Sequence, residues 1–95
     1  MEKFSLQRLL NPRSIAVVGA SDRPESRGFF VWQSISKSRN GRAVWPVNPK
    51  YRYIGNDLCY ARVDELPGAP DLAVVTLRSD LIADTLEALA RKGTL

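Results

Sequence analysis

The chain of 95 residues is long enough for one small domain, and its 44% of apolar and 25% of charged residues are ordinary values for a globular protein. This composition argues against intrinsic disorder, and no apolar run approaches the roughly 20 residues that a membrane-spanning helix needs. The chain has no histidine, which excludes histidine-based acid–base catalysis and histidine metal ligands in this segment. Its single cysteine excludes an internal disulfide.

The net charge of +4 is distributed unevenly along the chain. Residues 1–53 hold ten Lys/Arg and three Asp/Glu, whereas residues 54–95 hold four and seven. A basic half is typical of a protein that binds an anionic ligand or nucleic acid. Because the basic half lacks both a helix with clustered Lys and Arg and an aromatic platform for stacked bases, we expect no nucleic-acid partner.

The first elements are a short helix and a buried strand. Residues 4–10 have the spacing of an amphipathic helix, and Asn11-Pro12 ends it, because a residue before proline avoids the helical region. Residues 14–19 form a nearly continuous apolar run rich in β-formers. Such a run is typical of a strand that is buried on both faces, as in a parallel sheet.

A turn-rich loop, residues 19–26, leads into a second helix from about residue 27 to residue 37. Ser26 is the expected N-cap, and Arg39-Asn40-Gly41 is expected to end the helix as a glycine stop. The helix has a dense set of apolar positions, so we expect the helix to pack tightly on the sheet. These positions are Phe29, Phe30, Val31, Trp32 and Ile35.

The next segment predicts two short strands. Residues 43–47 form the first, and Pro46 indicates that this strand ends there. A turn follows at Asn48-Pro49-Lys50, and Leu58-Cys59-Tyr60 predicts a brief third strand.

The last third of the chain predicts a connector, a strand and a helix. Residues 64–70 are a connector with room for one helical turn, and residues 71–77 are an apolar strand. Residues 80–92 have helical spacing, with Ser79 as the expected N-cap and Gly93 just past the last turn.

This order of strands and helices predicts an α/β fold, a Rossmann-like doubly wound parallel sheet with flanking helices. Residues 93–95 resemble the start of another strand, so we expect residues 1–95 to be one partial domain, truncated at its C-terminus, from the N-terminal part of a larger protein. A missing strand leaves an unpaired sheet edge, which could pair with a second copy and give a homo-oligomer.

The N-terminus and the single cysteine favour a cytoplasmic protein. The first residues lead into no apolar signal core. Cys59 lies between Leu58 and Tyr60, so we expect a buried structural thiol rather than a reactive one. We therefore expect no membrane contact, no metal site and no catalytic residue in this segment.

Ligands of an open α/β sheet bind beyond the carboxyl ends of the strands, where the strand order reverses. Three loops leave such ends here, at residues 19–27, 48–53 and 76–79. The first loop keeps Gly19 of the G-x-G-x-x-G dinucleotide fingerprint, but the next glycine is Gly28. The second strand ends without an acid that could bind a ribose diol, which weakens an NAD interpretation.

The residues that remain favour a ligand rich in phosphate. Ser21 offers a hydroxyl, and the loop and helix start offer backbone N–H groups with a helix dipole behind them. Arg23, Arg27 and Lys50 add positive charge near the same strand ends. Each of these signals is weak alone, because a surface charge or a tight turn explains it equally well. Their joint position predicts the site.

Three motifs resemble the CoA-binding domain of NDP-forming acyl-CoA synthetases, a group that includes ADP-forming acetyl-CoA synthetases and relatives of the succinyl-CoA synthetase α subunit. They are LNPRSIAVVGAS at residues 10–21, VWPVNPK at residues 44–50, and LP with PDLAVV at residues 66–75. The motifs occur in the family's order and spacing, and the resemblance extends from about residue 6 to residue 95.

The resemblance implies a role for particular positions, with coenzyme A (CoA) or acyl-CoA as ligand. It implies that one loop meets the CoA phosphates, that a second lies beside the adenosine end with Lys50 as phosphate partner, and that the last strand's edge faces the pantetheine arm. The loop at the phosphates holds Gly19, Ala20 and Ser21. The loop at the adenosine end holds Asn48, Pro49 and Lys50, and the edge at the pantetheine arm holds Thr76 and Leu77. Two positions depart from the family: Arg78 stands where proline is usual, and Arg27 where a small apolar residue is common.

In these synthetases a histidine domain and a nucleotide-grasp domain carry out the chemistry, so the resemblance implies that this segment holds CoA for other domains of a parent ligase. Two alternatives stay open. The first is a CoA-sensing regulatory module, joined to a protein acetyltransferase or standing alone. The second is an NAD(H)-binding Rossmann domain with a redox role.

Overall fold

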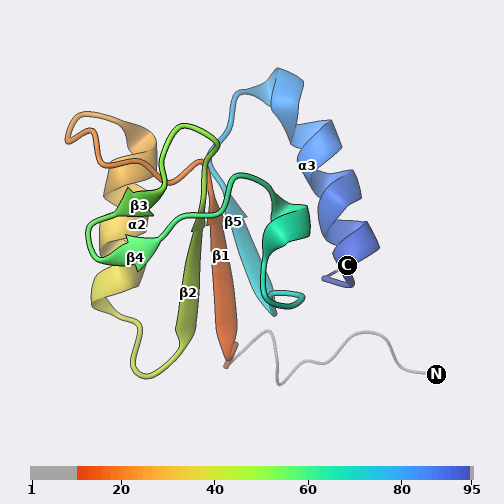
Figure 1. The fold of residues 1–95 in the computed structure, drawn as a ribbon, viewed down its shortest axis with the longest axis horizontal. Helices are drawn as coiled ribbons and strands as arrows, with labels where there is room; N and C mark the ends of the chain where they lie inside the picture. Colours follow the sequence, from red (N-terminus) through yellow and green to blue (C-terminus); the bar gives the residue numbers. More distant parts are fainter. Residues whose placement is uncertain (1–10, 95) are drawn as a thin grey trace.

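The computed structural model describes residues 11–94, so the helix predicted for residues 4–10 lies outside the described part. Three parallel strands form the central sheet in the order β2-β1-β5 (Figure 1). They are β1 (Ser14–Val18), β2 (Ala43–Val47) and β5 (Leu72–Val75). The first strand is therefore central, and the chain moves to its other side between β2 and β5.

Two helices cover the two faces of this sheet, α2 (Arg27–Lys37) on one and α3 (Ser79–Lys92) on the other (Figure 1). Alternate residues of β1 feed two separate cores. Val17 packs in the cluster that contains Trp32 of α2, whereas Ala16 packs in the cluster that contains Leu89 of α3. This alternation has the two-residue period of a strand. The predicted doubly wound Rossmann-like fold is confirmed.

The segment between β2 and β5 differs from the prediction. Instead of a strand at residues 58–60, β3 (Tyr53–Ile54) and β4 (Asp57–Leu58) form an antiparallel hairpin. The cause is Gly55, whose φ of 62° makes a tight turn between them. Tyr60 makes only an isolated parallel bridge to Val47. The helical turn expected in the connector is η1 (Val63–Glu65).

The caps of α2 and α3 are partly as predicted. Ser26 caps α2, because its hydroxyl accepts the Phe29 N–H at 3.1 Å, and Gly93 ends α3 with a φ of 106°. Ser79 is wrong as the N-cap of α3, because the helix already begins at this residue and Arg78 occupies the cap position without a side-chain cap bond. The glycine stop of α2 is also wrong, since the helix ends at Ser38 in a right-handed conformation.

Strands β1 and β5 are both shorter than predicted. β1 ends at Val18 rather than at Gly19, because Gly19 has a φ of 95° and leaves the strand conformation. β5 covers residues 72–75 of the predicted 71–77. The residues that follow each strand are therefore loop residues, which places them at the sheet edge.

Not every apolar residue of α2 packs on the sheet. Trp32 is buried, and Val31 and Ile35 are partly buried against the same core. Phe30, by contrast, is 70% exposed. Helical geometry explains this result, because four consecutive residues cannot all lie on one face of a helix. No helix within residues 11–94 is long and apolar enough to cross a membrane.

A bidentate ion pair fastens the hairpin to the end of α2. The Arg39 guanidinium donates to both carboxylate oxygens of Asp57, each at 3.1 Å, and it also donates to Ser36 at the end of the helix. Both charged side chains are partly buried, so water screens this pair less than an exposed pair. The hairpin therefore has a fixed position beside α2, close to the loop that follows β2 (Figure 1).

The start of α2 lies against the loop after β1, and Gly28 makes this possible. A Cβ atom at Gly28 would overlap the carbonyl oxygen of Gly19. We therefore predict that Gly28→Ala destabilises the protein by about 1–3 kcal/mol, because the helix must shift away from the sheet edge. Urea unfolding measures the loss.

Gly68→Ala is the matched control, because a Cβ atom there meets nothing within 4 Å. We expect this control to change the free energy of unfolding by less than about 1 kcal/mol. Equal stability of the two variants would contradict the close approach of α2 to the loop.

Candidate functional site

The three predicted loops meet at the carboxyl edge of the sheet. The parallel ladder continues one step beyond the strands, because the Gly19 N–H donates to the Val47 carbonyl and the Thr76 N–H donates to the Val18 carbonyl, each at 2.8 Å. The three loops therefore begin side by side, at the position where the strand order reverses. This is the position at which open α/β sheets bind ligands.

Gly19 is held between two elements. A Cβ atom at this residue would lie 2.5 Å from the Thr76 Oγ1 atom and 3.2 Å from the Leu77 Cδ2 atom, and its positive φ also favours glycine. On its other side, the carbonyl of Gly19 meets Gly28 of α2. The loop after β1 thus passes between the end of β5 and the start of α2.

Ala20 and Ser21 are buried, and the Ser21 hydroxyl has two partners inside the protein. Its Oγ atom accepts the Arg23 N–H at 3.0 Å, which folds the loop into a local turn. The same atom lies 3.2 Å from the Tyr51 hydroxyl, in the loop that follows β2. Ser21 is therefore the first point at which these two loops contact each other.

Asn48 makes the second contact between the same loops. Its Nδ2 atom donates to the Ala20 carbonyl at 2.9 Å, and its Oδ1 atom accepts the Lys50 N–H at 2.9 Å. The second bond closes an Asx turn, which confirms the turn expected at residues 48–50. The Asn48 side chain thus joins the two loops through both ends of its amide, and one of its two Nδ2 hydrogens has no acceptor among residues 11–94.

The edge after β5 is fixed in a similar way. The Thr76 hydroxyl donates to the Val18 carbonyl at 3.1 Å, and Leu77 packs against the core beneath α3. Arg78 is exposed and pairs with Asp80 at 3.2 Å. Its charge therefore lies at the start of α3 and is partly neutralised by its neighbour.

The exposed residues at this edge carry the positive charge. Arg23, Arg27 and Lys50 are exposed, as is Pro49, and within residues 11–94 none of the three cationic side chains has an ion-pair partner. The first turn of α2 contains no acidic residue. Its backbone N–H groups and helix dipole therefore favour an anion, while the exposed Asp22 and Glu25 of the preceding loop offset part of the cationic charge.

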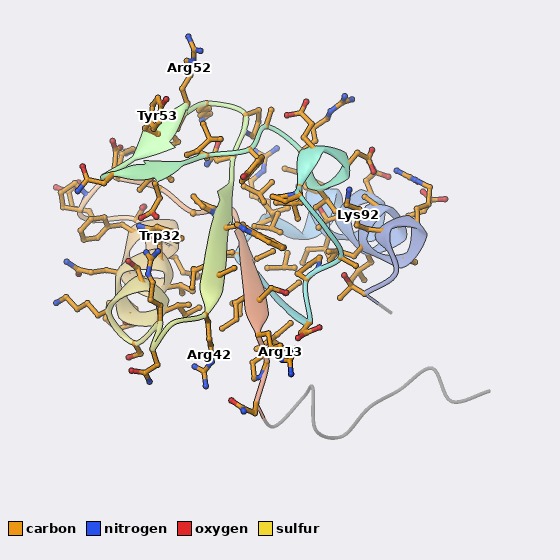
Figure 2. All side chains as sticks on the ribbon, turned by 60° about the horizontal axis from the view of Figure 1, so that its bottom comes forward. Arg13, Trp32, Arg42, Arg52, Tyr53 and Lys92 are labelled. Atoms are coloured by element: carbon orange, nitrogen blue, oxygen red, sulfur yellow. The ribbon has the colours of Figure 1, made fainter. Side chains whose placement is uncertain are left out.

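The basic half of the sequence does not gather at one site. Figure 2 shows Arg13 and Arg42 near the start of β1 and β2, at the amino end of the strands. Arg13 donates its backbone N–H to Asp71, and the Arg42 guanidinium donates to the Asn11 amide oxygen. These residues lie at the sheet edge opposite the loops, so only part of the excess charge can serve a ligand there.

The sequence motifs missed Tyr51. Its hydroxyl contacts Ser21, and its ring packs partly buried against the core on the α2 side. Its position directly after Asn48-Pro49-Lys50 was the available signal, because the Asx turn brings the next side chain back towards the first loop.

Within residues 11–94, no group of three or more Asp, Glu, Cys or His side chains could hold a metal ion.

Cys59 is buried beneath the loop after β2, as expected. Its thiol lies 3.5 Å from the Asn48 carbonyl oxygen, to which it donates. Burial raises the pKa of the Cys59 thiol above its ordinary value of 9.0. The thiol therefore stays protonated at neutral pH and fills space in the core.

A doubly wound sheet with a glycine turn, a helix start and exposed cations at its carboxyl edge is the arrangement in which Rossmann-like domains bind phosphate-bearing ligands. The family of CoA binding domains matches residues 13–94, and the chain belongs to this family. The resemblance seen in the three sequence motifs is thereby confirmed.

The relatives that the chain resembles in sequence include ADP-forming acetate–CoA ligases. The chain is 34% identical over 88 residues to the α subunit of acetate–CoA ligase [ADP-forming] II from Pyrococcus furiosus, covering 93% of this chain and 19% of that protein. It is 31% identical over 90 residues to acetate–CoA ligase [ADP-forming] from Methanocaldococcus jannaschii, covering 95% and 12%. The chain thus spans about a fifth or less of the length of these relatives.

Solved structures agree in fold. An acetyl-coenzyme A synthetase from Candidatus Korarchaeum cryptofilum superimposes with a TM-score of 0.86 at 31% identity, over 93% of this chain and 19% of that one. A hypothetical protein from Pyrococcus horikoshii superimposes with a TM-score of 0.80 at 30% identity, over 92% and 60%.

The raised pKa of Cys59 predicts a pH dependence of stability. Below the ordinary pKa of 9.0 the thiol is protonated in both states, so its contribution is complete. Above pH 9 the unfolded thiol ionises while the folded one resists, and stability is lost as pH rises towards the folded pKa. Urea unfolding of the wild type and of Cys59→Ala should therefore give a stability difference that is constant from pH 7 to 8 and shifts against the wild type above pH 9. A difference that is independent of pH would contradict the prediction.

Proposed function

We propose that this chain is the CoA-binding domain of an ADP-forming acyl-CoA synthetase. Such a ligase interconverts acyl-CoA, nucleoside diphosphate and phosphate with the free acid, CoA and nucleoside triphosphate. The domain would hold CoA while other domains of the same ligase carry out the chemistry. Family membership and the ligases among its relatives support this proposal.

The composition of the edge supports binding rather than catalysis. The Thr76 hydroxyl already donates its proton within the protein, and the chain has no histidine that could act as acid, base or phosphate carrier. What the edge offers is hydrogen-bond donors, among them backbone N–H groups, and cations. These groups stabilise an anionic ligand without reacting with it.

The observation that carries the proposal is the meeting of the three loops around Gly19, with unpaired cations at the rim. CoA has two regions of phosphate charge, its diphosphate and its 3′-phosphate. In the proposed arrangement the diphosphate lies over the Gly19 loop and the start of α2, with Arg23 and Arg27 nearby. Lys50 binds the 3′-phosphate, and the edge at Thr76 and Leu77 takes the pantetheine arm.

The proposal includes the setting of the domain. Residues 1–95 would form an N-terminal part of a longer cytoplasmic ligase, whose other domains are its main partners. Within the described residues β5 pairs only with β1, so its outer edge is open to a further strand. That strand could come from the same protein or from a second copy in a homo-oligomer.

Calorimetric titration with CoA, dephospho-CoA and NADH tests the ligand class in the protein at its full encoded length. We expect CoA to bind most tightly, dephospho-CoA more weakly and NADH least. The 3′-phosphate is the chemical group that separates the first two ligands. Preference for NADH would overturn the proposal in favour of a redox domain.

Lys50→Ala tests the 3′-phosphate contact. Loss of a charged hydrogen bond at a partly solvated site should weaken CoA binding about tenfold and dephospho-CoA binding less than twofold. Lys37→Ala is the matched control, because Lys37 lies in the last turn of α2, at the far end from the loops. Equal losses for both ligands would reject the role of Lys50 without rejecting CoA binding.

A further inference from the structure

We propose that Tyr51 is a positioning residue for the diphosphate of CoA: it orients the Ser21 hydroxyl so that the Ser21–Tyr51 pair donates one hydrogen bond to a diphosphate oxygen. The inference rests on the proposed function, since it concerns the same ligand. It adds a residue outside the glycine loop, and it follows from the hydrogen-bonding capacity of two hydroxyl groups.

The Ser21 and Tyr51 hydroxyl groups together have one more proton than the bond between them uses. A hydroxyl group has one proton and two lone pairs. One lone pair of the Ser21 oxygen accepts the Arg23 N–H at 3.0 Å, and a second bond joins this oxygen to the Tyr51 oxygen at 3.2 Å. Whichever oxygen donates in that second bond, the pair has two protons and uses one internally.

The second proton has no acceptor within the protein. Among residues 11–94, neither hydroxyl donates to a carbonyl or carboxylate oxygen, whereas the neighbouring Thr76 hydroxyl donates to Val18. Ser21 is only 7% exposed and Tyr51 is partly buried, so access of water to this proton is restricted. A buried donor without an acceptor is costly, and a ligand oxygen at this place removes that cost.

The position of the pair selects a phosphate oxygen as that acceptor. Ser21 follows Gly19 and Ala20 in the loop that faces the start of α2, where the helix dipole and backbone N–H groups favour an anion. A hydrogen bond from a hydroxyl to an anionic oxygen is roughly twice as strong as one between neutral groups. The Arg23 bond and the Tyr51 bond together fix the direction in which the Ser21 oxygen can act.

The two loops do not need the Ser21–Tyr51 bond to stay together. Asn48 already joins the same two loops through its bond to the Ala20 carbonyl at 2.9 Å. The ring of Tyr51 packs against the core without help from its hydroxyl. Removing the hydroxyl alone should therefore leave the loops in place, and its loss should be seen in ligand binding.

Tyr51→Phe removes the hydroxyl and keeps the ring. In calorimetric titrations we expect it to weaken the binding of CoA and of dephospho-CoA by the same factor, about tenfold, because both ligands carry the diphosphate. The melting temperature should change little. Tyr53→Phe is the matched control, because Tyr53 is 59% exposed and points away from the sheet (Figure 2), so CoA affinity should change less than twofold.

A double-mutant cycle with Ser21→Ala separates positioning from support. If Tyr51 acts through Ser21, the double variant binds CoA no more weakly than Ser21→Ala alone. Penalties that multiply in the double variant, or unchanged CoA affinity in Tyr51→Phe, would overturn the inference. Should Tyr51→Phe fail to fold, Ser21→Ala decides: a tenfold loss supports the inference, and full affinity rejects it.

The same titrations distinguish this inference from the proposed function. Wild-type protein that binds CoA while Tyr51→Phe binds equally well rejects the role of Tyr51 and leaves the proposed function intact. Wild-type protein that prefers NADH, or binds none of the ligands, rejects the proposed function and this inference with it.

Discussion

The structure depends on the contact between the backbone of Gly19 and the first turn of α2. Gly28 brings the helix so close to the Gly19 carbonyl that no Cβ atom fits between them, and Gly19 in turn lies against Thr76. Two glycines nine positions apart thereby bring the start of a helix and the ends of two strands into one place. A conventional dinucleotide fingerprint assigns close approach and helix packing to glycines in one short run. Here the second glycine lies within the helix itself.

This contact explains why the predicted site residues form two groups. The residues nearest the sheet use their polar atoms on each other, as Asn48 does with Ala20 and Thr76 does with Val18. The cationic residues further out, such as Lys50, have no ion-pair partner in the described part of the chain. The inner group sets the shape of the edge, and the outer group supplies charge. Substitutions in the two groups should consequently affect different properties.

The fold and the meeting of the three loops could be predicted because long-range order here follows from local patterns. The apolar runs of β1 and β5 and the spacing of α3 defined the sheet and its layers, and Gly19 marked the loop. The hairpin could not be predicted, because its two-residue strands are too short for any periodicity and depend on a turn at Gly55 and the distant Arg39–Asp57 pair. The exposure of Phe30 likewise depends on which face α2 turns to the sheet. Tyr51 was missed because its contact with Ser21 spans 30 positions of sequence.

The residue after Asn48 also affects how durable the edge is. The spontaneous conversion of asparagine to aspartate begins when the next backbone nitrogen, having lost its hydrogen, attacks the side-chain amide. Pro49 has no such hydrogen, so this route is closed at Asn48. The amide that bonds to both Ala20 and Lys50 would lose its donor on that conversion and gain a negative charge beside a site for anions. The proline that follows Asn48 in the turn therefore also prevents this conversion of Asn48 to aspartate.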